Sequence, residues 1–152
     1  MDVYVLVGQG KTGKSSITRS LLGSAQNGAR LIATVTVSIM IYVHLMSLQE
    51  DPKRITPTDF ENEILEQAGK HSLDATLVSL RLNARSGCPD ADGYLKHFNN
   101  LGWNIVRVAC FDIPVSSITT PLPNGTVRSF PHIGNTTVNQ LAAEVRAFFG
   151  WI

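Results

Sequence analysis

One stretch near the start of the chain decides its fold, Tyr4-Val5-Leu6-Val7-Gly8-Gln9-Gly10-Lys11-Thr12-Gly13-Lys14-Ser15-Ser16. Before the glycines, the apolar run from Val3 to Val7 predicts a short buried strand. After them, residues 17–22 carry apolar side chains at helical spacing and predict a helix. A strand, a glycine-rich loop and a helix in this order form the kind of turn that can hold a phosphate group.

The loop itself contains the residue types that bind phosphate. Gly8, Gly13, Lys14 and Ser15 match the pattern G-x-x-x-x-G-K-[ST] at every position. These glycines and Gly10 let the backbone turn tightly and point successive N–H groups inward, while the start of the following helix adds a positive dipole end. The Lys14 ammonium can reach β- and γ-phosphates, and the Ser15 hydroxyl can ligate Mg²⁺.

Through this Walker A motif the sequence resembles the P-loop NTPase superfamily. The motif itself is short, but the alternation of strands and helices extends the likeness along the chain. The resemblance implies that ATP or GTP binds with Mg²⁺. It also implies that the nucleotide is held by Gly8, Gln9, Gly10, Lys11, Thr12, Gly13, Lys14, Ser15 and Ser16, with Asp112 free to contact the base.

Composition restricts the remaining function classes. The chain has 152 residues, of which 43% are hydrophobic and 16% charged, so we expect one globular domain over 1–152. A net charge of +1 gives no electrostatic reason to expect nucleic acid or an anionic membrane as partner. Cys88 and Cys110 lack metal-ligand spacing, and no basic leader precedes the loop. We therefore expect a cytoplasmic protein.

The stretch from Leu31 to Gln49 raises the question of a membrane span. It contains no Asp, Glu, Lys or Arg and is long enough to cross a bilayer. It is, however, rich in Thr, Val and Ile, which favour strands. We predict two strands, over about 30–37 and 39–46, or one long strand, in place of a membrane helix. His44 within this stretch is interpreted as a core histidine with satisfied hydrogen bonds.

Further elements follow in alternation. A helix is predicted from Thr56 to Gly69, and its apolar face consists of Phe60, Ile64, Leu65 and Ala68. Strands are predicted over 75–82 and 103–111, and helices over 90–101 and 137–149. The segment 115–134, with its prolines and glycines, is predicted to be a long functional or mobile loop. The pattern predicts a three-layer α/β/α fold with a mostly parallel sheet of about five strands. The loops after Val7, Ser47, Leu82 and Phe111 should then meet around the phosphate site.

A nucleotide hydrolase also needs a second group for Mg²⁺ and a group that orients water. Asp112 follows four apolar residues, 108–111, as a Walker B aspartate does, although a strand-end residue in solvent explains the same pattern. Glu50 is the other candidate ligand, since 47–51 places several polar and acidic groups after a strand. Arg81, Arg85 and Arg107 lie on or near strand ends, and any of them could stabilise phosphoryl charge.

The sequence is also similar, in a looser way, to small GTPases. The order of elements is shared, the loop 23–28 corresponds to a switch, and Ser-Leu-Gln-Glu at 47–50 stands where that family carries Ala-Gly-Gln-Glu. The similarity implies that Gln49 orients the attacking water. The metal-bridging Asp of the family falls on Leu45, however, and of the guanine motif only Asp112 is retained, so guanine specificity is not implied.

These observations favour a small P-loop NTPase that binds ATP or GTP with Mg²⁺ and hydrolyses it slowly. Lys14, Gln49 and Glu50 would be its catalytic residues, and Ser15 with Glu50 or Asp112 its metal ligands. Two alternatives remain open. One is a small-molecule kinase with 115–134 as a lid. The other is a degenerate GTPase-like switch or scaffold that binds nucleotide without catalysis and acts on a protein partner or as a homodimer.

Overall fold

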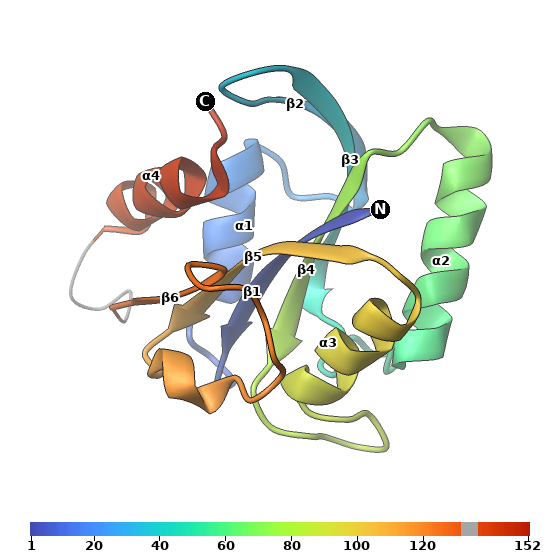
Figure 1. Ribbon diagram of the computed structural model, residues 1–152, viewed down its shortest axis with the longest axis vertical. Coiled ribbons are helices and arrows are strands. Elements are labelled where there is room, and N and C mark those ends of the chain that lie inside the picture. The colour runs from blue at the N-terminus through green and yellow to red at the C-terminus, as the bar shows by residue number, and fades with distance from the viewer. Residues whose placement is uncertain (132–136) are drawn as a thin grey trace.

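A six-stranded sheet forms the centre of the computed structural model, which describes residues 1–131 and 137–152 (Figure 1). The strands are β1 (Asp2–Gly8), β2 (Gly28–Ala33), β3 (Ser38–Ser47), β4 (Ala75–Arg81), β5 (Asn104–Phe111) and β6 (Val127–Phe130). Their order is β2-β3-β4-β1-β5-β6, and every neighbouring pair is parallel except β2 with β3. The predicted α/β class with a mostly parallel sheet is therefore confirmed.

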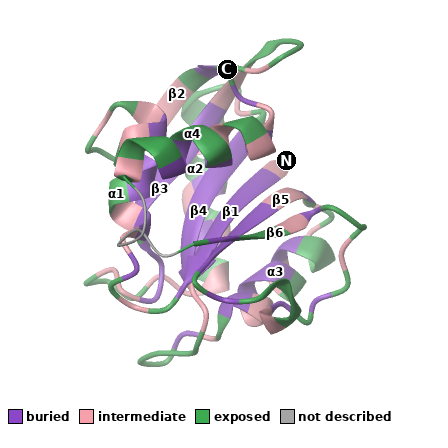
Figure 2. Ribbon diagram, turned by 90° about the vertical axis from the view of Figure 1, so that its left-hand side faces the viewer, coloured by how far each residue is buried: buried purple, intermediate pink, exposed green. Residues whose placement is uncertain are grey.

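Helices cover both faces of this sheet. They are α1 (Lys14–Leu22), α2 (Pro57–Lys70), α3 (Ala91–Asn100) and α4 (Val138–Phe149), with a short 3-10 helix η1 (Val115–Ser117). One core cluster lies between the sheet and α1 with α4, around Leu6, Ile17 and Leu141. The other lies between the sheet and α2 with α3, around Val5, Phe60 and Tyr94. Figure 2 shows the central strands buried between these layers.

The sixth strand corrects the expectation of about five strands and of an unstructured segment over 115–134. β6 pairs in parallel with β5, from Val108 with Val127 to Phe111 with Phe130. Its four residues are too few for periodicity to reveal. The strand is held by tertiary contacts: its pairing with the sheet edge and the stacking of Phe130 on Phe111, at 5.8 Å between ring centroids. Residues 132–134 of the predicted loop lie outside the described residues.

The hairpin β2/β3 confirms strands in the stretch that raised the membrane question, with a turn at 34–37 that the sequence did not signal. The Thr34 hydroxyl accepts hydrogen bonds from the N–H groups of Thr36 and Val37 at 3.3 and 3.1 Å. A threonine side chain thus does what Gly, Pro or Asn usually does in a turn. Among the described residues, every helix is too short or too polar to cross a membrane.

The start of α2 confirms the predicted beginning at Thr56, whereas the helix runs past the predicted end at Gly69 to Lys70. Thr56 and Asp59 form a capping box at the start of α2, with Pro57 in the first turn. The predicted apolar face of α2 is too wide, because Phe60 and Ile64 are buried whereas Leu65 is 62% exposed. Ala68 is also exposed. The apolar side chains that α2 packs against the sheet are thus four residues apart, as one face of a helix requires.

The sheet order positions the candidate site. β1 lies between β4 and β5, so that Gly8 at the end of β1 is level with Arg81 and Phe111. β3 is separated from β1 by β4. The residues that follow β1, β3 and β4 therefore lie at the same end of the sheet, as expected for parallel strands.

Candidate functional site

The glycine loop, residues 8–15, connects β1 to α1 with a tight backbone. Gly13 has φ 81° and lies directly before α1, whose first turn carries no acidic residue and receives no hydrogen bond from a side chain at its N-cap. A Cβ at Gly8 would lie 2.7 Å from Thr12 Oγ1 and 3.3 Å from the carbonyl oxygen of Phe111. The start of α1 is thus a helix N-terminus whose N–H groups are available to an anion.

Lys14 is a buried cation in this loop. Its side chain folds back over the loop, where Nζ donates to the carbonyl oxygens of Gly8 (3.1 Å) and Gln9 (2.8 Å) and to Thr12 Oγ1 (3.3 Å). The residue is 4% exposed, and within residues 1–131 and 137–152 it forms no salt bridge. Burial lowers the pKa of Lys14 to about 8, with the charge of Glu50 acting in the opposite direction.

A cavity of about 300 Å³ opens above the loop, lined by Lys11, Thr12, Gly13, Lys14, Ser15, Ser47 and Glu50. The fold thus brings the loop together with the residues that follow β3. The Ser15 hydroxyl lies 3.5 Å from the carbonyl oxygen of Leu45. Ser47 was not singled out in the sequence, although a polar residue at the end of a buried strand is the signal that could have found it. Ser16 is exposed on α1.

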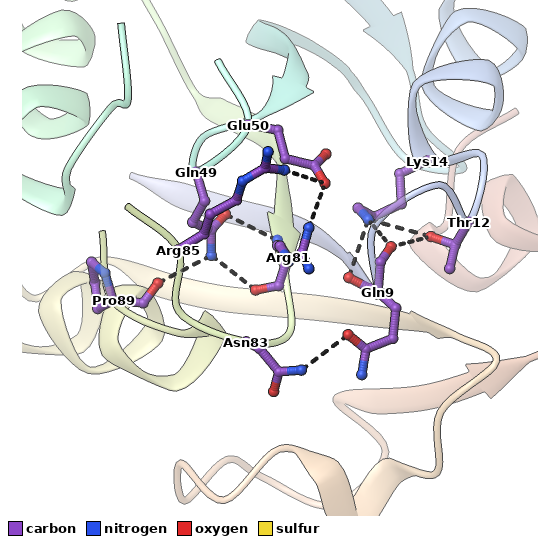
Figure 3. A network of polar contacts seen from close by, with 10 residues as sticks. Gln9, Thr12, Lys14, Gln49, Glu50, Arg81, Asn83, Arg85 and Pro89 are labelled. Atoms are coloured by element: carbon purple, nitrogen blue, oxygen red, sulfur yellow. Dashed lines mark hydrogen bonds and ion pairs between the residues drawn. The ribbon is translucent and has the colours of Figure 1, made fainter. Parts of the chain in front are cut away.

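Glu50 is held beside the loop by two arginines (Figure 3). Its Oε1 lies 3.3 Å from Arg81 Nη1 and 3.8 Å from Arg85 Nη1. A second cavity of about 280 Å³, lined by Gln9, Gly10, Lys11, Glu50, Arg81 and Arg85, adjoins this ion pair. A Cβ on Gly10 would lie 2.7 Å from Arg81 Nη1 and 3.1 Å from Glu50 Oε1. Gly10 therefore leaves the space that the ion pair fills.

Gln49 has a different place from the one implied by the likeness to small GTPases. It is 1% exposed, and its Nε2 donates to the carbonyl oxygens of Arg81 (2.8 Å) and Pro89 (3.2 Å). Its Oε1 accepts a hydrogen bond from the Arg81 N–H at 3.0 Å. Both amide hydrogens are therefore used by the backbone, and Gln49 does not line either cavity described above. We assign it a structural role.

Asp112 also lies apart from the two cavities. It is exposed, has φ 56°, and its N–H donates to the carbonyl oxygen of Phe130 at 3.0 Å. It is not among the residues that line either cavity. In the part of the chain that the structure describes, no group of three His, Cys, Asp or Glu side chains could hold a metal ion.

Two further candidates have structural surroundings. Arg107 donates to the carbonyl oxygens of Val106 and Phe148 and lies over the Phe148 ring, away from the loop. His44 has Nδ1 at 3.2 Å from Glu63 and Nε2 at 3.0 Å from Asp51, which confirms a core histidine with satisfied hydrogen bonds. Burial alone would lower the pKa of His44, but the two carboxylates outweigh it and raise the pKa.

Comparison with known proteins finds no family model, curated protein or solved structure that matches this chain. The geometry and charge of the loop and of the two cavities beside it are the features that indicate a function.

Proposed function

We propose that the protein binds a nucleoside triphosphate, ATP or GTP, together with Mg²⁺ at the glycine loop and hydrolyses it slowly. The observation that carries this proposal is the buried charge of Lys14. An ammonium group taken out of water without a carboxylate partner is costly, so its presence in a cavity indicates an anionic ligand. Its hydrogen bonds to two carbonyls and a hydroxyl compensate for only part of that cost.

The loop supplies the other donors that a phosphate chain needs. The N–H groups of residues 10–15 would present positive dipole ends to a bound anion, and so would the uncapped start of α1. Lys14 would neutralise charge on the outer phosphates. Rigid donors of this kind need no reorganisation as charge shifts between phosphate oxygens, which is how such a site lowers a barrier.

The side chains in the cavity suit Mg²⁺ in the presence of phosphate. Magnesium keeps several waters and takes one or two protein oxygens, the remainder coming from substrate phosphates. The Ser15 hydroxyl and the Glu50 carboxylate line the same cavity and would hold it there. When bound, the metal would supply charge neutralisation at the phosphates. We assign the carboxylate role to Glu50 because Asp112 lines neither cavity.

Binding without turnover is the second candidate function, and the position of Gln49 favours it. A hydrolase needs a group that orients water. The amide hydrogens of Gln49 are used by backbone carbonyls, and Glu50 is paired with arginines. A switch that binds nucleotide and passes its state to a protein partner would need neither group to be free.

Calorimetric titration of ATP and GTP, with Mg²⁺ and then with EDTA, tests the proposal. Replacing Lys14 by Met keeps the buried stem and removes the charge, so affinity should fall by about 100-fold. Lys96→Met, at an exposed position on α3, is the matched control and should bind as the wild type does. An unchanged affinity in a folded Lys14→Met variant would contradict the proposal. A phosphate-release assay on the wild type then separates hydrolase from switch.

A further inference from the structure

The second cavity, which we call the arginine cavity, holds more positive than negative charge. Lys11, Arg81 and Arg85 line it, and Glu50 is the carboxylate among its lining residues. Arg81 Nε is buried without a hydrogen-bond partner in the part of the chain that the structure describes. One carboxylate shared between two guanidinium groups leaves donors unused, so the cavity is suited to an oxyanion with more oxygens than a carboxylate has.

The ion pair that fills this cavity is exchangeable. The side chains of Arg81 and Glu50 are 28% and 24% exposed, and that of Arg85 is 51% exposed. Partly exposed pairs of this kind contribute little to stability, because solvent screens the two charges. A ligand group with greater charge and more acceptor oxygens can therefore take the place of the carboxylate.

The arginine cavity adjoins the cavity above the glycine loop. Lys11 and Glu50 line both, so they form the common wall between them. A chain of phosphates seated on the loop, with Lys14 beside it, would be directed at this wall by its outermost group. The side chain that such a group would meet first is Glu50, which carries the same sign of charge.

We propose that the Glu50 carboxylate, in the protein without ligand, occupies the site between Arg81 and Arg85 that binds the terminal phosphate of a triphosphate. The outermost phosphate displaces the carboxylate from this site on binding. This inference rests on the proposed function and adds a second subsite, which distinguishes a triphosphate from a diphosphate. Glu50 then turns from the arginines toward the Ser15 side of the wall, where it lines the other cavity.

The neighbouring structure permits this exchange without movement of the backbone. Gln49 holds the backbone of Arg81 at both its N–H and its carbonyl group, so the ends of β3 and β4 stay joined. Gly10, which has no side chain, leaves Arg81 Nη1 and Glu50 Oε1 the space that they occupy above the loop. Rotation of the Glu50 side chain alone would open the subsite.

Base-free probes test the inference directly. Tripolyphosphate and pyrophosphate are titrated calorimetrically in EDTA at pH 7.5 against the wild type, Lys14→Met, Glu50→Gln, Arg81→Gln and the double variant Glu50→Gln/Arg81→Gln. Glu50→Gln should bind tripolyphosphate about tenfold more tightly, because the competing charge is gone, and pyrophosphate less than twofold more tightly. In the Arg81→Gln background this gain should disappear. Glu66→Gln, on the exposed face of α2, is the control for a change of net charge.

Each outcome separates the inference from the proposed function. An equal gain for both probes, or a gain that persists without Arg81, shows a general charge effect and overturns the inference. A loss of tripolyphosphate affinity in Glu50→Gln overturns it too, while Lys14-dependent pyrophosphate binding would leave the proposed function standing. Absence of any Lys14-dependent binding of either probe overturns both. If Arg81→Gln does not fold by circular dichroism, Arg85→Gln replaces it with the same expectations.

Discussion

The side chain of Gln49 bonds the backbone of Arg81 on both sides, donating to its carbonyl oxygen at 2.8 Å and accepting from its N–H at 3.0 Å. The β3–β4 ladder shifts register between His44 and Ser47, and its last backbone bond runs from Leu48 N–H to Ser79. The Gln49 amide continues that ladder beyond the strand. It thereby fixes where Glu50 and Arg81 stand relative to the glycine loop.

Replacing Gln49 should therefore destabilise the protein before it changes any chemistry. Gln49→Ala leaves the N–H and carbonyl of Arg81 without their partners, and we expect unfolding free energy to fall by about 2–3 kcal/mol. Gln49→Glu should cost at least as much, because a carboxylate then faces two carbonyl oxygens. Urea denaturation measures both, with the exposed Gln26→Ala as control. Full stability of Gln49→Glu together with lost turnover would instead support the water-orienting role.

Two glycines of the loop should respond differently to a methyl group. In Gly8→Ala the Cβ meets the Thr12 hydroxyl and the backbone oxygen of Phe111, so we expect a loss of about 1–3 kcal/mol. In Gly10→Ala the Cβ meets only the ends of two flexible side chains, so the loss should stay below about 1 kcal/mol while the Glu50–Arg81 pair separates. Gly69→Ala, in α2 with nothing within 4 Å of its Cβ, should be neutral or stabilising. Equal losses at Gly8 and Gly10 in urea denaturation would contradict this.

The lowered pKa of Lys14, about 8, predicts two pH effects of opposite sign. Nucleotide affinity should fall as pH rises through about 8, since the free protein loses the proton that a phosphate needs. The folding contribution of the same group runs the other way. Between about 8 and its ordinary pKa of 10.5, the unfolded chain binds more protons than the folded one, so stability from this group rises with pH.

Titrations of ATP and GTP between pH 7.5 and 9.5 measure the first effect, because a terminal phosphate group, whose last pKa is near 6, is already ionised there. Lys14→Met should remove both the decline in affinity and the rise in stability. An affinity that stays level across this range in the wild type would be inconsistent with a buried, titrating Lys14.

The raised pKa of His44 predicts a decline of stability with pH in a different range. Its ring faces Glu63 and Asp51, and a neutral imidazole can donate to only one of them. The stabilising contribution is fully present below the ordinary histidine pKa of about 6.5 and is lost as pH rises through the higher pKa of the folded state. The pKa of Glu63 is lowered, because the hydrogen bonds from His44 and Tyr42 outweigh its burial, so its contribution is lost on acidification.

Denaturant titrations from pH 5 to 9 check this expectation. His44→Gln should flatten the decline above pH 6.5, whereas His71→Gln, at the exposed end of α2, should retain it. A decline of the same size in both variants would place the titrating group elsewhere.

Local patterns allowed the α/β class and most elements to be predicted. The glycine spacing from Gly8 to Ser15 and the helix start at Thr56 each depend on residues a few positions apart. The same holds for the strands in 31–49, where β-branched residues outweighed the absence of charge. These features follow from backbone sterics and short-range hydrogen bonds, which sequence spacing determines.

The composition of the site was decided by tertiary structure. Strand β6 forms because it can pair with the edge of β5. The turn at 34–37 forms because the Thr34 side chain accepts a backbone hydrogen bond from the Val37 N–H. Asp112 and Glu50 both follow strands, and the sequence favoured Glu50 only slightly, through the polar and acidic residues at 47–51. The order of the strands places Glu50 at the loop with Arg81, and the continued ladder buries Gln49 away from it. Strand order and side-chain direction depend on contacts between residues tens of positions apart, which no local pattern encodes.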